Sequence, residues 1–201
     1  MSQPRWAALG CMLLLAAAAS GQQPGRQRDA QSSYEPRSAP GVGQQFLSRM
    51  AGEWEVAKTF FPRNGQPVHA NGTCRQTMIQ EGRFLKSEFV FGEGEHQSTG
   101  LGIIGFDTTK GIFTSVWVDS RRTQMSMRQS GDRFDGKQIV MYGRAIGDNP
   151  KGPFRSRTVS TLEDGDRKLV HRQYAIDSEG KERLMMELLM TRKGEAQPSS
   201  R

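Results

Sequence analysis

Cysteine and histidine are scarce in this chain, whose 201 residues include two cysteines and three histidines. Cys11 lies in an N-terminal segment that we expect to be removed, so Cys74 is left without an internal disulfide partner and the fold must be held by its core. His69, His96 and His171 show no metal-ligand spacing with one another. A GxSxG nucleophile motif is also missing. The sequence therefore points to no metal ion, no cofactor and no set of catalytic residues.

Long apolar runs are missing too, except at the N-terminus. Arg5 precedes the apolar run Trp6–Ala19, and small residues follow it. This is the pattern of a secretory signal peptide, and the run is too short for a transmembrane helix. The mean hydropathy of −0.65 argues against a membrane-embedded mature domain. We predict a signal peptide at residues 1–21 and an exported protein, periplasmic or extracellular.

A run of basic residues is the next absence. The net charge of +7 becomes +6 once Arg5 is removed with the signal peptide. The remaining lysines and arginines are spread along the chain, unlike the clustered charge of an interaction tail. In an exported protein this charge suits solubility or anionic surfaces. We expect no nucleic-acid partner.

What is present is a middle segment with the rhythm of a β protein. Residues 22–45 are rich in Gln, Ser, Pro, Gly and Arg and predict a flexible linker, and residues 194–201 predict a disordered tail. The domain between them, 46–193, opens with one short helical turn at Phe46–Gly52. Period-two runs separated by turn residues follow it. These runs are Trp54–Phe60, Val68–Gln80, Phe84–Phe91, Gln97–Asp107, Ile112–Asp119, Gln124–Phe134, Lys137–Arg144, Phe154–Glu163, Arg167–Ile176 and Glu182–Thr191.

Such a series of short strands on tight turns must pair antiparallel, because a parallel pair needs a long crossover. Closure into a barrel removes the two exposed edges of a simple meander. The last run supports this, since Leu184, Met186, Leu188 and Met190 share one parity and give it an apolar face. We predict an all-β fold, an antiparallel up-and-down barrel of about ten strands.

The segment Gly100–Gly105 matches the dinucleotide-binding pattern GxGxxG. That site needs a helix directly after the glycines, where the pyrophosphate binds. Here Phe106–Gly111 leads into another strand. We interpret the glycines as positions where a barrel strand bends or packs closely.

Methionine is plentiful. The chain has ten methionines, and eight of them lie after the expected signal peptide. Methionine fills irregular gaps in ordinary cores, and it also suits a cavity for varied apolar ligands. A barrel of this size can hold one small ligand. By size and strand position, Phe89, Trp117, Met127 and Met141 are the candidate ligand-binding residues.

A family resemblance rests on the order of several short motifs. They are Gly52-Glu53-Trp54, Gly82-Arg83-Phe84-Leu85, Gly100-Leu101-Gly102, Ser115-Val116-Trp117-Val118-Asp119-Ser120 and Thr191-Arg192-Lys193. In this order the domain resembles the bacterial family of unknown function 1579, and its Gly-x-Trp resembles the calycin superfamily of lipocalins and fatty-acid-binding proteins. The resemblance implies a calycin-like barrel. It also implies that Arg192 lies over the Trp54 ring and closes one end of the barrel.

Three functional hypotheses follow. The first is an exported, non-catalytic barrel that binds a small hydrophobic or amphipathic ligand. The second is an enzyme of unrecognised type with a polar cluster in the barrel, for which Lys58 and His171 are candidates. The third is a structural or interaction module with a packed core and an exposed apolar patch.

Overall fold

The computed structural model describes residues 38–145 and 155–194. The expected signal peptide, most of the predicted linker (residues 22–37) and residues 195–201 of the predicted tail lie outside the described residues. The helix α1 (Val42–Met50) begins four residues before the predicted domain boundary. The backbone N–H of Gly41 donates to Gln44 Oε1 at 2.8 Å, and Gln44 Nε2 donates to the Phe106 carbonyl at 2.8 Å. Residues 41–45 therefore belong to the folded domain, because they are bonded to it.

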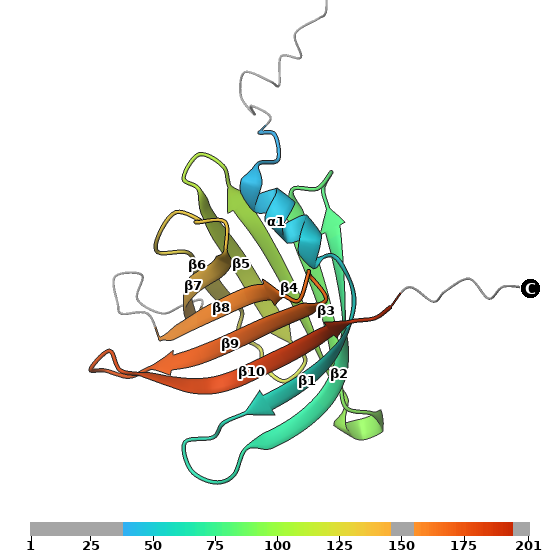
Figure 1. Cartoon of the computed structure of the whole chain (residues 1–201). Coiled ribbons are helices and arrows are strands. Elements are labelled where there is room, and N and C mark those ends of the chain that lie inside the picture. The colour runs from blue at the N-terminus through green and yellow to red at the C-terminus, as the bar shows by residue number, and fades with distance from the viewer. Residues whose placement is uncertain (1–37, 146–154, 195–201) are drawn as a thin grey trace, which may run out of the picture. The chain divides into compact units, whose positions relative to one another are not determined.

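Ten antiparallel strands form a closed barrel in which each strand pairs with its sequence neighbours and β10 pairs with β1 (Figure 1). The strands are β1 (Gly52–Phe60), β2 (Val68–Ile79), β3 (Phe84–Phe91), β4 (Ser98–Asp107), β5 (Ile112–Asp119), β6 (Ser126–Gln129), β7 (Gln138–Ala145), β8 (Ser156–Glu163), β9 (Lys168–Ile176) and β10 (Glu182–Arg192), with a short 3₁₀ turn η2 (Gly94–His96) between β3 and β4. The predicted fold class is confirmed.

Two strands depart from the period-two expectation. β6 has only four residues, whereas the predicted run spans Gln124–Phe134. The Ser130 N–H still donates to the Phe113 carbonyl, the chain then leaves the ladder, and the Phe134 N–H donates to the Gly111 carbonyl. In β10 the register with β9 shifts between Leu184 and Met186, which is a β-bulge. Leu184 pairs with Tyr174 while Met186 pairs with Gln173. The prediction that Leu184, Met186, Leu188 and Met190 share one face of β10 therefore holds for the last three residues and not for Leu184.

α1 lies across one end of the barrel, and the turn between β1 and β2 lies at the opposite end (Figure 1). Its buried residues Phe46, Leu47 and Met50 join the main core. The Phe134 ring packs edge-on against Phe46 and Phe113, with ring centroids 5.1 and 5.0 Å apart. The helix and these aromatic rings close this end.

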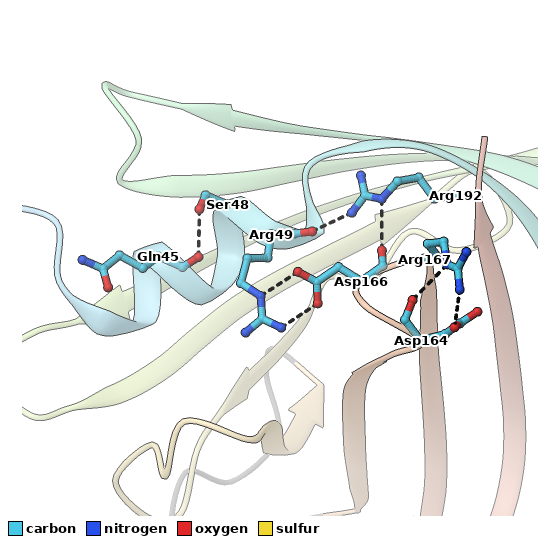
Figure 2. A network of polar contacts seen from close by, with 7 residues as sticks. All are labelled: Gln45, Ser48, Arg49, Asp164, Asp166, Arg167 and Arg192. Carbon is cyan, nitrogen blue, oxygen red and sulfur yellow. Dashed lines mark hydrogen bonds and ion pairs between the residues drawn. The ribbon is translucent and has the colours of Figure 1, made fainter. Parts of the chain in front are cut away.

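Arg192 and Trp54, which the resemblance places together, meet beneath the C-terminus of α1. The guanidinium carbon lies 4.3 Å from the centroid of the Trp54 ring. Arg192 also donates to the carbonyls of Arg49 and Ala51 at 2.6 Å and of Asp166 at 3.0 Å. Figure 2 shows the bonds to Arg49 and Asp166. Arg49 lies in the last turn of the helix, whose carbonyls have no helical partner, and Ala51 is the residue that caps it. One side chain therefore joins β10, the end of α1 and the turn between β8 and β9.

Gly52 is explained by the same contact. Its φ of +137° disfavours any residue with a side chain. A Cβ added there would also collide with Nη1 of Arg192. The Gly-x-Trp motif thus supplies the space for the guanidinium and the ring beneath it.

Candidate functional site

A cavity of about 590 Å³ occupies the barrel interior. All ten strands contribute inward-facing residues to its wall, and Met50 of α1 lies at its closed end. At the other end the lining includes Phe60, Arg121, Arg122 and Gln124, which are exposed to solvent. The cavity therefore reaches the surface at the end opposite α1.

One side of the cavity is aromatic. Phe89 and Trp117 meet edge to face with ring centroids 5.6 Å apart, and Phe91 stacks beside Phe89 at 5.9 Å. The indole fits because a Cβ at Gly100 would collide with its ring, and a Cβ at Gly102 would lie 3.3 Å from it. The glycines of the GxGxxG segment thus make room for a side chain, and the structure places a strand after them.

The polar part of the wall begins on the strand next to that of Trp117 and includes Arg128 of β6. Arg128 pairs in register with Ser115 and Gly143, and Thr158, Ser160 and His171 line the cavity from β8 and β9. Its Nε atom is buried and has no hydrogen-bond partner in the structure. Burial lowers the pKa of Arg128, and among the described residues no carboxylate pairs with it. A guanidinium does not lose its proton in a protein, so this half-buried residue carries a positive charge, with a buried Nε, that no described carboxylate compensates.

His171 and Ser160 form the only neighbouring pair that resembles nucleophilic machinery in the described part of the wall. Ser160 Oγ and His171 Nδ1 lie 2.8 Å apart. Burial and then the nearby charge of Arg128 lower the pKa of His171 to about 4. A base this weak accepts a serine proton poorly at neutral pH, where an effective general base has a pKa near the working pH. The contact therefore satisfies two buried polar groups and does not indicate catalysis.

The mouth carries positive charge. Lys58 Nζ lies 3.9 Å from the centroid of the Phe91 ring. Burial, and then the neighbouring charge of Arg121, lower the pKa of Lys58. Asp119 opposes the cations, but its carboxylate is already engaged. It accepts hydrogen bonds from Trp117 Nε1 at 3.1 Å and from the Arg121 backbone N–H at 2.9 Å. These bonds keep the pKa of Asp119 low despite the opposing effect of burial.

Three of the four candidate ligand-binding residues lie in the wall, namely Phe89, Trp117 and Met141. Met127 does not, since it is 52% exposed on the outer face of β6. The register explains the correction. Ser126 pairs with the inward-facing Trp117, so Ser126 and its alternate neighbour Arg128 face inward and Met127 faces outward.

Sequence reasoning missed Arg128 and the polar side of the cavity. In β6, Met127 points to one face of the sheet while Ser126 and Arg128 point to the other. In an alternating strand the apolar side chain is normally expected to face the interior, which would turn Met127 inward and Arg128 outward. Because an irregular loop separates β5 from β6, the inward or outward facing of β6 residues cannot be counted from β5. The two residues proposed for an enzymatic cluster do face one cavity, but Leu188 lies between Lys58 and His171 in the strand register.

Within residues 38–145 and 155–194, no group of three or more His, Cys, Asp and Glu side chains is placed to hold a metal ion. In the same residues, no helix has both the length and the apolar character needed to cross a membrane.

Comparisons with known proteins agree with this architecture. The crystal structure of Rv2717c from M. tuberculosis is similar, with a TM-score of 0.56 and 11% sequence identity. The match covers 78% of this chain and 100% of that chain, and at this identity it shows the fold alone. No curated protein matches the sequence. A family model described as a protein of unknown function, DUF1579, matches residues 39–192. The chain therefore belongs to the DUF1579 family, with a calycin-like ten-stranded barrel.

Proposed function

We propose that this protein binds one small, largely apolar molecule inside its barrel and does no chemistry on it. The observation that carries the proposal is the cavity of about 590 Å³, which lies within the usual range of roughly 300–1,000 Å³ for small-molecule sites. Its wall combines aromatic rings and methionines with a few polar groups. This is the composition expected of a ligand pocket.

The methionines support a binding site that adapts to its ligand. Met141, Met185, Met186 and Met190 all line the cavity. Unbranched thioether side chains change rotamer at little cost and can fit ligands of different shape. The bulge in β10 turns both Met185 and Met186 toward the interior, which adds apolar surface near the mouth.

The alternatives fit the structure less well. A structural module requires a packed interior, whereas this barrel holds a cavity. The enzymatic hypothesis needs Lys58 and His171 in one cluster, whereas Leu188 lies between them in the strand register and His171 is a weak base. Export remains part of the proposal. Mass spectrometry of the purified protein is expected to show the loss of residues 1–21.

Titration with N-phenyl-1-naphthylamine, a neutral fluorophore that brightens in apolar surroundings, tests binding. We expect saturable binding of one molecule per chain. Replacing Ser115 with phenylalanine puts a ring into the cavity and should weaken binding at least tenfold. Its neighbour Thr114 is exposed, so Thr114→Phe is the matched control and should bind like the wild type.

Two results oppose the proposal. One is a failure of the wild-type protein to bind this fluorophore or any neutral apolar probe. The other is equal weakening by Ser115→Phe and Thr114→Phe, because the fluorophore would then bind outside the barrel.

A further inference from the structure

We propose that the ligand of the cavity is an amphipathic anion whose acid group binds the guanidinium of Arg128. This inference rests on the proposed function and adds the chemical class of the ligand. It follows from three features of the described residues, namely the state of Arg128, the groups around it and the charge at the mouth.

Arg128 lacks the hydrogen-bond and carboxylate partners that a partly buried arginine normally has. Its Nε atom is buried without a hydrogen-bond partner, and no described carboxylate pairs with the guanidinium. Buried charges in proteins are almost always paired, because an unpaired one carries the full cost of leaving water. A planar guanidinium offers its donors in a fork that fits the two oxygens of a carboxylate. An incoming acid group therefore supplies the missing partner.

The surroundings of Arg128 suit an acid head and an apolar tail. Ser115 and Ser160 line the same cavity and provide hydroxyl donors. The lowered pKa of His171 keeps it neutral at physiological pH, so it does not compete with Arg128 as a second cation for the acid group. Phe89 and Trp117 offer an aromatic surface to a hydrocarbon or aromatic tail, and Trp117 lies on β5, the strand next to that of Arg128.

The mouth favours the entry of an anion. Lys58, Arg121 and Arg122 line it, and Asp119 is the acidic residue among them. Asp119 and Arg121 form an ion pair at 3.5 Å and offset each other, so Lys58 and Arg122 leave the mouth with a net positive charge. A cleft with one sign of charge and apolar walls concentrates ligands of the opposite charge.

A series of decyl compounds with one chain length and three head groups tests the inference. Decanoate, decan-1-ol and decylammonium are each used to displace N-phenyl-1-naphthylamine from the wild-type protein. We expect decanoate to bind at least tenfold more tightly than decan-1-ol, and decylammonium to bind most weakly. Replacing Arg128 with methionine should abolish the preference for decanoate and leave the binding of decan-1-ol within about twofold of its wild-type value.

Arg75→Met is the matched control, because Arg75 lies on β2 with 69% of its side chain exposed. It should keep the tenfold preference. Arg128→Lys serves as a second variant, since it keeps the charge but loses the fork and should retain only part of the preference.

The outcomes separate the two proposals. If the fluorophore binds and the three decyl compounds displace it equally, the cavity stands and the anion assignment is overturned. A preference for decanoate that survives in Arg128→Met also overturns it, because the charged mouth would then be responsible. If neither the fluorophore nor any decyl compound binds, the proposed function itself fails.

Discussion

Replacing Arg192 with alanine should destabilise the barrel more than replacing any exposed arginine. The side chain donates to three backbone carbonyls, at 2.6, 2.6 and 3.0 Å, and lies 4.3 Å from the Trp54 ring centroid. Hydrogen bonds to a charged group are worth roughly 1.5–3 kcal/mol each, and a cation–π contact about 0.5–2 kcal/mol. These contributions overlap, and the guanidinium is only partly buried. We therefore expect a loss of about 3 kcal/mol in the free energy of unfolding.

Urea denaturation monitored by tryptophan fluorescence measures this loss as a lower midpoint with an unchanged slope. Arg75→Ala is the control, because Arg75 lies on an exposed strand face and makes a 3.4 Å ion pair with Glu53. Surface ion pairs of this kind contribute about 0–1 kcal/mol. Arg192→Lys should fall between the two, since an ammonium keeps the charge but not the fork. If Arg192→Ala unfolds at the same urea concentration as Arg75→Ala, the closing contact does not stabilise the barrel.

Three further predictions concern the interior. Because the folded-state pKa of His171 (about 4) lies below its ordinary value of 6.5, the folded chain binds fewer protons between these values. Stability should therefore fall by up to roughly 3 kcal/mol as the pH drops from 6.5 to 4, and urea midpoints for His171→Gln should lack this component. Gly100→Ala should cost about 1–3 kcal/mol by crowding Trp117, with a shifted fluorescence maximum; an unchanged spectrum and midpoint would speak against the packing described. Burial raises the pKa of the Cys74 thiol to about 12, so a thiol reagent should label it only at the rate of unfolding, and fast labelling at pH 8 would contradict its burial.

The strand pattern of the barrel could be predicted because alternation and turn residues are local properties of the sequence. Gly111, for example, ends one turn and precedes β5 (Ile112–Asp119), whose bounds agree with the predicted run. Antiparallel pairing followed from the short turns between strands, and closure followed from the two exposed edges that an open meander of ten strands would leave. The start of α1 at Val42 could not be predicted in this way. It depends on Gln44, whose partner is the distant Phe106 carbonyl.

The facing of individual residues was harder to predict. Parity can be counted only from a known reference and only while the ladder is regular. In β10 the bulge before Met186 reverses which residues face inward. In β6 the facing cannot be counted from β5, because the loop after Asp119 interrupts the strand pattern. Met127 was therefore placed inside and Arg128 was overlooked. An arginine in a short strand such as Ser126-Met127-Arg128-Gln129 looks the same in sequence whether it faces solvent or a cavity.

A crystal structure of the protein with 10-bromodecanoate tests the central claim most directly, because bromine can be located by its anomalous scattering. The account predicts one bromine position inside the barrel, among the rings and methionines of the wall, with the carboxylate next to Arg128. A bromine on the outer surface, or an interior filled by collapsed side chains, would contradict it.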